Sequence, residues 1–394
     1  MSIAAFVLVG AIGLAFLYHA LVLLLDLRLM ATMPVLERLR PLEPARWPRV
    51  SVIIPACNEA AGLEAAMRSK LAEDYPDVEF ILVDDRSTDG TGAIVDRLAE
   101  RDRRIRAIHV TELPAGWLGK LNAMQKGVEA STGEWLLFSD ADVHLAPGTL
   151  RRTVALCEER KLEHLSVVPE LMGGGPMIDG CITAFLLPLG VVVQPRSVED
   201  PRSKNACGVG AFNLVRRATL DRSPGFEWLK LEVGDDVALG QMLKRQAGAR
   251  AAVANGRGMV RVLWYGSVRE MASGAEKNGF ALAGRYRVGI LLAAGSFTYL
   301  VALAPLLALL PLGVPWLRPL AVADLAVTTG LAMAINRWVR APLLPALLWI
   351  PGSLLLTSMV LRSGWLAVRR NGVAWRGTLY PLDALRAGQR ITIP

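Results

Sequence analysis

Hydrophobic residues follow two different patterns along this chain. Residues 3–25 are almost all apolar, and three further apolar stretches lie near the C-terminus, at 288–312, 319–335 and 342–361. Stretches of this length and composition are candidate transmembrane helices. Between them, short apolar runs alternate with helical patterns, which is typical of a mostly parallel sheet with helices on both faces. The pattern therefore predicts an α/β domain flanked by N-terminal and C-terminal transmembrane helices.

The predicted sheet begins with four short apolar runs that end at polar residues. They are 50–55, 78–84, 105–110 and 134–139. Helical patterns over 59–73, 92–100 and 120–130 separate these runs. In an open parallel sheet, ligands bind at the carboxyl ends of the strands. Acidic clusters that follow two of these strands are therefore candidate ligand-binding groups.

Composition and charge support a membrane protein. Of the 394 residues, 53% are hydrophobic and 20% are charged, with a net charge of +8. Such a basic excess suits an anionic membrane face or a phosphate-bearing substrate. We expect no nucleic acid partner, because no repeated basic and aromatic module is present. The four scattered cysteines indicate neither a zinc site nor a disulfide framework, and favour a reducing setting.

The chain divides into six predicted segments. They are an N-terminal transmembrane anchor (1–27), a basic juxtamembrane linker (28–48), an α/β domain (49–261), an interfacial helix (262–287), C-terminal membrane helices (288–366) and a basic tail (367–394). Arginines follow the first apolar run, so the positive-inside rule predicts that the N-terminus lies outside and the α/β domain in the cytoplasm. We therefore expect a multi-pass protein of the cell (inner) membrane.

The topology of the C-terminal region contains a conflict. Three full crossings from the cytoplasm would leave the tail outside, whereas the arginines of the tail predict that it lies inside. One segment is then re-entrant or interfacial, and 342–361, which contains Pro351 and Gly352, is a candidate. A further apolar stretch at 181–193 is short and contains Pro188, so it is predicted to be a buried or interfacial helix.

Two acidic clusters follow predicted strands. Asp84 and Asp85 precede a Ser/Thr/Asp/Gly turn, which either binds a nucleotide or is only a turn with a helix cap. Asp140 and Asp142 offer two hard oxygen ligands of the kind that Mg²⁺ or Mn²⁺ prefers, and the alternative is a surface turn. Two such clusters at strand ends of one domain favour the functional interpretation.

A third acidic pair, Asp235 and Asp236, begins a helical pattern. Acidic residues at a helix start are often only capping groups that suit the helix dipole. The functional interpretation is a general base that takes a proton from an acceptor hydroxyl. The choice between the two depends on the rest of the domain.

Together these motifs resemble the membrane-bound inverting glycosyltransferases of glycosyltransferase family 2. The family's opening strand, V-x-I-P-x-x-N-E, is similar to residues 52–59, and its G-K-x-x-A segment is similar to residues 119–123. The resemblance implies a GT-A fold, which is a Rossmann-like, mostly parallel sheet. It implies that the nucleotide-sugar is bound by Pro55, Ala56, Asn58, Glu59, Asp84, Asp85, Lys120 and Asp140.

The same resemblance assigns the remaining site residues. Asp140 and Asp142 match the metal-binding D-x-D pair, which implies Mn²⁺ or Mg²⁺ as cofactor. Asp236 matches the catalytic base, and Asp235 is its acidic neighbour. The acceptor side is assigned to Gly208, Gly210 and Ala211.

The chain also departs from the family pattern. Arg86 stands where glycine is commoner after the paired aspartates, and Asp235 stands where glutamate is frequent. The Q/R-x-x-R-W motif of processive members, which follows the base, is missing, because the Arg-Trp pair after Asp236 is Arg337 and Trp338, between membrane segments. The pattern therefore favours transfer of one sugar per acceptor. Within the family, the arrangement looks like the branch that glycosylates hopanoid-type, carotenoid-acid and ceramide-type lipids.

The resemblance thus implies an inverting, metal-dependent, non-processive transferase that moves a sugar from a UDP-sugar to a lipid hydroxyl or carboxyl. One alternative is a nucleotide-binding membrane scaffold or transporter component without catalysis. Only Asp324 lies within the C-terminal apolar runs, which is little charge for a transport path. Nucleotidyl or phosphoryl transfer is disfavoured, since no G-x-x-x-x-G-K-[ST] loop is present.

Overall fold

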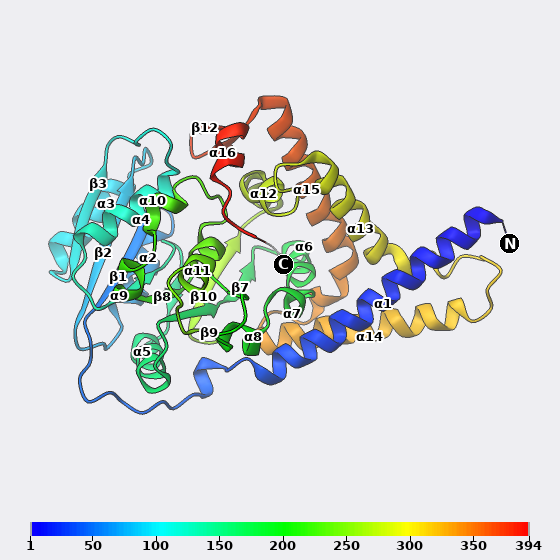
Figure 1. The fold of residues 1–394 in the computed structure, drawn as a ribbon, viewed down its shortest axis with the longest axis horizontal. Coiled ribbons are helices and arrows are strands. Elements are labelled where there is room, and N and C mark those ends of the chain that lie inside the picture. The colour runs from blue at the N-terminus through cyan, green and yellow to red at the C-terminus, as the bar shows by residue number, and fades with distance from the viewer. Residues whose placement is uncertain (1, 393–394) are drawn as a thin grey trace. The chain divides into compact units, whose positions relative to one another are not determined.

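The computed structural model describes residues 2–392 and consists of two compact units, shown as a ribbon in Figure 1. The sheet unit comprises residues 33–170, 195–263 and 383–392, and the helical unit comprises residues 2–32, 171–194 and 264–382. Segments of the two units therefore alternate along the chain. This division differs from the six consecutive segments expected from the sequence, because 171–194 leave the α/β domain and the end of the basic tail joins it.

The sheet unit is built around a seven-stranded, mostly parallel sheet, as predicted. Its strand order is β3-β2-β1-β4-β8-β6-β9. The strands are β1 (Val50–Ala56), β2 (Val78–Asp85), β3 (Ile105–Val110), β4 (Trp135–Phe138), β6 (His164–Val168), β8 (Asn213–Arg216) and β9 (Ala251–Asn255). Only β8 runs antiparallel to its neighbours β4 and β6. Because β8 is reversed, its first residues lie at the same sheet edge as the last residues of β1 and β4.

Helices cover both faces of this sheet because the strand order reverses between β1 and β4. The crossovers through α2 (Leu63–Leu71) and α3 (Thr91–Arg101) lead outward to β2 and β3, and the crossover through α4 (Gly119–Ala130) leads back to β4. Right-handed crossovers in opposite directions place their helices on opposite faces. A Cβ on Gly127 of α4 would overlap the side chain of Ile53, so this glycine permits close packing on β1.

The rest of the sheet unit consists of short helices and a small second sheet. The helices are α5 (Thr149–Arg160), α8 (Pro195–Glu199), α9 (Arg217–Asp221), α10 (Gly225–Leu229), α11 (Asp235–Arg245) and most of α16 (Leu382–Gly388). The second sheet contains β5 (His144–Leu145) and most of β10 (Val260–Tyr265), which pair antiparallel. The short strand β7 (Glu170–Gly173) belongs, apart from Glu170, to the helical unit. The core is formed by the central strands, in which Val52, Ile53 and Phe80 are fully buried.

The helical unit contains four helices that are long and apolar enough to cross a membrane. They are α1 (Ile3–Thr32), α13 (Val288–Leu307), α14 (Leu317–Val339) and α15 (Trp349–Arg370), the last preceded by the 3-10 turn η2 (Leu344–Leu348). Large apolar side chains on α1 are open to the surroundings, among them Ile3 at 85% and Phe6 at 69% exposure. Such exposure suits a lipid environment. The four predicted apolar segments are therefore confirmed as helices.

Three further parts of the helical unit are short. The apolar stretch 181–193 falls into α6 (Pro176–Leu186) and α7 (Leu189–Val192), which are separated at Pro188. The expected interfacial helix is α12 (Val268–Leu282), whose N-cap Ser267 accepts a hydrogen bond from the Glu270 amide. The chain after α15 forms a hairpin of β11 (Gly372–Trp375) and β12 (Thr378–Pro381), where the sequence predicted only a basic tail.

Candidate active site

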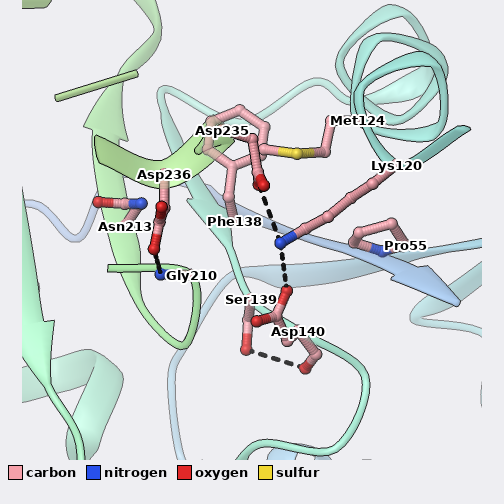
Figure 2. A pocket seen from close by; sticks show the side chains of 10 residues that line it. All are labelled: Pro55, Lys120, Met124, Phe138, Ser139, Asp140, Gly210, Asn213, Asp235 and Asp236. Atoms are coloured by element: carbon pink, nitrogen blue, oxygen red, sulfur yellow. Dashed lines mark hydrogen bonds and ion pairs between the residues drawn. The ribbon is translucent and has the colours of Figure 1, made fainter. Parts of the chain in front are cut away.

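A pocket opens at the carboxyl ends of β1 and β4, where the strand order reverses. Figure 2 shows its lining, which consists of Pro55, Lys120, Met124, Phe138, Ser139, Asp140, Gly210, Asn213, Asp235 and Asp236. This edge of an open α/β sheet is where ligands bind in doubly wound folds. The pocket therefore brings together residues from five separate segments of the sheet unit.

Lys120 connects two of the acidic clusters. Its Nζ lies 2.8 Å from Asp140 Oδ1 and 2.9 Å from Asp235 Oδ2, so that it lies between them in Figure 2. Burial lowers the pKa of Lys120, but Asp140, Asp235 and Asp236 outweigh this effect and hold its pKa well above the usual range. Lys120 therefore stays charged and holds the D-x-D turn beside the start of α11.

Asp236 is oriented by two backbone amides. Its Oδ2 accepts a hydrogen bond from Gly210 N at 2.9 Å, and its Oδ1 accepts one from Val237 N at 2.8 Å. Burial, followed by the charge of Asp235, raises the pKa of Asp236, although Lys120 and the two amides act in the opposite direction. A carboxylate with a raised pKa that lines an open pocket has the properties of a general base.

The small residues before β8 bring the backbone against both acidic clusters. A Cβ on Gly208 would overlap the carbonyl oxygen of Asp236, and a Cβ on Gly210 would lie 2.8 Å from Asp140 Oδ2. The Gly210 carbonyl also accepts a hydrogen bond from Asp140 N at 3.2 Å. Ala211 is buried behind these glycines. Of the three residues assigned to the acceptor side, only Gly210 lines the pocket.

The carboxylates at the end of β2 do not line this pocket. Asp85 forms an ion pair with Arg86 at 2.8 Å, and a Cβ on Gly119 would overlap its carboxylate. Asp85 thus lies against the first residue of α4, next to Lys120. Asp84 contacts His109 Nδ1 at 3.2 Å, and the hydrogen bonds of the His109 ring to Asp96 and Asp84 raise the pKa of His109.

Hydrogen bonds connect the loop after β1 to the turn after β2. Asn58 has a positive φ of 57°, accepts a hydrogen bond from Thr88 N at 2.8 Å and donates its own amide to Ser87 Oγ. The Glu59 amide donates to Thr91 Oγ1 at 2.8 Å. The helix predicted over 59–73 is shorter in the structure: α2 comprises Leu63–Leu71, although the Leu63 amide donates to the Glu59 carbonyl at 3.0 Å. Among the first-loop residues assigned to the nucleotide, only Pro55 lines the pocket; Ala56 is buried in β1.

Asp142 and Asp140 suit a divalent cation by chemistry, although they are only two ligands. Burial raises the pKa of Asp142 to about 6, and the charges of Asp140 and Glu59 add to this effect. A cation would relieve this crowding of negative charge, and further oxygen ligands could come from a bound diphosphate. Within residues 2–392 no group of three His, Cys, Asp or Glu side chains could hold a metal ion.

Lys70 was not selected from the sequence, yet it holds the backbone of the turn that contains Asp140 and Asp142. Lys70 is fully buried, and its Nζ donates to the carbonyl oxygens of Asp140, at 3.3 Å, and of Val143. Burial lowers the pKa of Lys70 to about 8, while Asp142 and Asp140 oppose this shift. In the sequence, Lys70 is one more polar residue of an amphipathic helix, so no local signal distinguishes it.

Asn213 was also missed as a pocket residue. It is buried at the start of β8, where its Oδ1 accepts hydrogen bonds from Ser166 Oγ at 2.9 Å and from Val209 N at 3.3 Å. Met124 and Phe138 add apolar surface to the lining. Met124 and Phe138 follow helical and strand periodicity that fits ordinary core residues equally well, so no sequence pattern distinguishes them as pocket residues.

Comparison with known proteins agrees with this geometry. Residues 51–170 match the family model described as Glycosyl transferase family 2. The chain is 32% identical over 116 residues to the uncharacterized glycosyltransferase EpsJ of Bacillus subtilis, a match that covers 29% of this chain and 32% of EpsJ. It is 35% identical over 103 residues to the GalNAc(5)-diNAcBac-PP-undecaprenol beta-1,3-glucosyltransferase of Campylobacter jejuni, with 26% of this chain and 32% of that protein covered. The matches thus span about a third of the length of these curated relatives.

The fold also has a solved counterpart. The mannosyltransferase PcManGT from Pyrobaculum calidifontis, solved in complex with GDP-Man and Mn²⁺, superposes with a TM-score of 0.52. The two chains are 21% identical, and the match covers 92% of this chain and 97% of that one.

The sheet topology and the pocket define a GT-A fold. Residues 51–170 are a glycosyl transferase family 2 domain, so the chain carries the domain of a transferase enzyme together with four apolar helices that suit membrane association. The family resemblance and the fold class expected from the sequence are confirmed.

Proposed function

We propose that this protein is an inverting, metal-dependent, non-processive glycosyltransferase that moves a sugar from a nucleotide-sugar to a membrane lipid. The donor is a UDP-sugar, and the acceptor group is a lipid hydroxyl or carboxyl. The observation that carries the proposal is the pocket in which Lys120 joins Asp140 to Asp235 while Asp236 stays oriented by the Gly210 amide. The Lys120 ammonium, which suits a phosphate, and the Asp236 carboxylate, which suits a base, line the same pocket, and this supports the proposal.

The proposed reaction is a single displacement at the anomeric carbon. Asp236 takes the proton of the acceptor hydroxyl while the acceptor oxygen forms a bond to that carbon; a carboxyl acceptor attacks as the carboxylate and has no proton to give. The bond from the same carbon to the diphosphate oxygen breaks, and the nucleoside diphosphate leaves with the electron pair. Because attack and departure occur on opposite faces, the configuration inverts. Lys120 stays charged and stabilises the negative charge of the diphosphate.

Asp140 and Asp142 would hold the proposed cation, Mn²⁺ or Mg²⁺, which supplies neutralising charge for the departing diphosphate. The crowded carboxylates and the raised pKa of Asp142 support this assignment. A neighbour solved with GDP-Man and Mn²⁺ is consistent with it. We assign Asp84, Asp85, Asn58 and Glu59 to the nucleoside end of the donor, because their two interlocked loops follow β1 and β2 at the same sheet edge.

We further propose that the sheet unit lies in the cytoplasm, at the inner membrane. The helices α13, α14 and α15 lie in the chain between residue 263 and the last segment of the sheet unit, whose tail residues 390–392 bond to Glu232 and Gln241. The tail must therefore lie on the same side as the sheet unit. Three complete crossings between them would separate the two, so an even number of these helices spans the membrane.

Contacts within the helical unit support α15 as the helix that does not cross. Trp349, at the start of α15, donates to Thr329 Oγ1 near the middle of α14 at 3.1 Å. Further along α15, Arg362 and Arg370 pair with Glu276 of α12 at 2.8 and 3.0 Å. Because α12 leads directly into α13, α15 returns to the side on which α13 begins. This path supports the re-entrant segment expected for 342–361.

The test is a transfer assay on the full chain in nanodiscs. UDP- and GDP-sugars are screened with Mn²⁺ or Mg²⁺ and a total lipid extract, and both nucleoside diphosphate and glycolipid are measured. We expect metal-dependent transfer that Asp236→Asn abolishes and that the exposed control Asp221→Asn retains. Nucleotide binding without transfer to any lipid would instead favour the scaffold or transporter alternative.

A further inference from the structure

The last described residues of the chain pack against the segment that carries the acidic pair of the pocket. After α16, residues 389–392 run along the loop between α10 and α11 and along α11 itself. Ile391 is buried, and a Cβ on Gly388 would overlap the side chain of Leu231. All of these residues belong to the sheet unit. The contact therefore lies within one compact unit.

Glu232 is the centre of this contact. Its side chain is buried, with the residue 2% exposed, and both carboxylate oxygens are used. Oε1 accepts a hydrogen bond from Gly234 N at 3.0 Å, immediately before the acidic pair. Oε2 accepts hydrogen bonds from the amides of Arg390 and Ile391, the second at 3.0 Å. One buried carboxylate thus joins the tail backbone to the loop that leads into α11.

A second attachment lies on α11. The Gln241 side chain donates to the Thr392 carbonyl and accepts from the Thr392 amide, both at 3.1 Å. Gln241 therefore pairs with the tail as a neighbouring strand would. The start of the same helix carries Asp235 and Asp236. The tail consequently holds α11 both before its first residue and in its second half.

A third attachment joins the tail to α10, whose following residue is in turn hydrogen-bonded to the segment before Lys120. Arg390 Nε donates to the Trp228 carbonyl at 3.0 Å, and its guanidinium lies 5.3 Å from the centre of the Trp228 ring. Two residues on, the Lys230 carbonyl accepts a hydrogen bond from Leu118 N at 2.7 Å. Because Gly119 begins α4, this bond connects the segment that the tail contacts at Trp228 to the helix that carries Lys120.

We propose that residues 388–392 are a clasp that positions Asp235 and Asp236 for transfer, with Glu232 as the positioning residue that connects the clasp to the acidic pair. This inference rests on the proposed function. The clasp acts first on the geometry of the base, and through Asp235 and α4 it also reaches Lys120. The loops at the ends of β1 and β2, which are assigned to the nucleoside, lie outside it. Loss of the clasp should therefore lower kcat by a larger factor than it weakens nucleotide binding.

The test compares three variants of the full chain in nanodiscs with the wild type. They are a truncation that removes residues 389–394, Glu232→Gln, and the control Glu227→Gln, whose side chain is 67% exposed on α10. We expect kcat to fall about 10- to 100-fold in the first two variants, since small misplacements of a reacting group have effects of this size. The dissociation constant of UDP should rise by a smaller factor than kcat falls, and the control should match the wild type.

Two readouts separate positioning from general destabilisation. A synthetic peptide with the sequence of residues 383–394 should restore the rate of the truncated variant, and amide hydrogen exchange should rise across 233–238 in both variants. Unchanged kcat, or equal losses of kcat and UDP binding without rescue by the peptide, would overturn the clasp. A wild-type protein that transfers nothing would overturn the proposed function instead. If the variants showed unchanged amide hydrogen exchange across 233–238, the clasp would be overturned, even for a wild-type protein without transfer activity.

Discussion

At the scale of single residues, the pocket depends on charges that compensate one another. Lys120 lies between Asp140 and Asp235, and its side chain is 27% exposed. Without it, two carboxylates from separate elements would face each other with no counter-charge. The sequence motif predicted Lys120 as a nucleotide contact, and the structure adds that it bridges the two acidic clusters.

Replacing Lys120 by Met should therefore impair the enzyme strongly. Hydrogen bonds to charged groups contribute about 1.5–3 kcal/mol each, so one lost bond corresponds to roughly a 10- to 150-fold lower kcat/KM. Steady-state transfer kinetics would measure the effect. Lys126→Met is the matched control, because Lys126 lies on the same helix and pairs only with the exposed Glu129. Equal activity of the two variants would contradict the role of Lys120.

The raised pKa of Asp236 predicts the pH dependence of transfer to a hydroxyl acceptor. The base must be ionised to accept a proton, so activity is present above this pKa and is lost as the pH falls through it. Because burial and Asp235 raise the pKa, the acid limb of kcat should lie above the ordinary value of 3.8. A pH profile of kcat at saturating donor checks this. An acid limb at or below pH 4 would show that Asp236 is not the titrating base.

At the scale of elements, the site depends on how closely backbones approach one another. The stretch before β8 passes so near the start of α11 that a Cβ on Gly208 would overlap the Asp236 carbonyl. Gly240 of α11 likewise faces the Cys207 carbonyl, which a Cβ would overlap. The antiparallel insertion of β8 beside β4 creates this approach.

Gly208→Ala should consequently separate β8 from α11 and misplace Asp236. We expect kcat to fall by about 100-fold, the size expected for a displacement of roughly 1 Å. The melting temperature should also fall. Gly62→Ala serves as the control, because no atom lies within 4 Å of its Cβ position and its φ is −113°. If Gly208→Ala retained full activity, the approach of these two elements would not position the base.

At the scale of the whole molecule, the number of membrane crossings follows from where the tail binds. The sheet unit and residues 390–392 are in contact, so they share one side of the membrane. In the proposed topology that side is the cytoplasm, as the positive-inside rule favours. The proposed return of α15 to its starting side would let the arginines of α15 and of the tail satisfy the same rule.

Reporter fusions test this topology. A phosphatase fused after Gly313, in the loop between α13 and α14, should be active, because that loop is expected outside. A phosphatase fused after the C-terminus should be inactive, and a fluorescent protein at the same point should be bright. The reverse result at the C-terminus would mean that α15 crosses the membrane and that the tail contact does not form in the cell.

The motifs predicted the site unevenly. Asp140, Asp235, Asp236, Lys120, Pro55 and Gly210 meet in the pocket. Asp84 and Asp85 lie on the adjoining loops, so their contacts with the nucleotide remain predictions, as do the ligand roles of Asp140 and Asp142. Lys70, Glu232 and Asn213 had no sequence signal, because each acts through a contact with residues remote in the chain, which for Asn213 is Ser166.

By itself, the sequence determined the α/β class, the four apolar helices and the family, because these depend on periodicity and on short motifs at strand ends. Only the tertiary structure decided that 171–194 join the helical unit, that β8 runs antiparallel, and that the chain end binds Glu232 and Gln241. The physical reason is that local patterns record which face of an element is buried, but not which distant segment buries it. Hydrogen bonds across more than a hundred residues leave no periodicity in the chain.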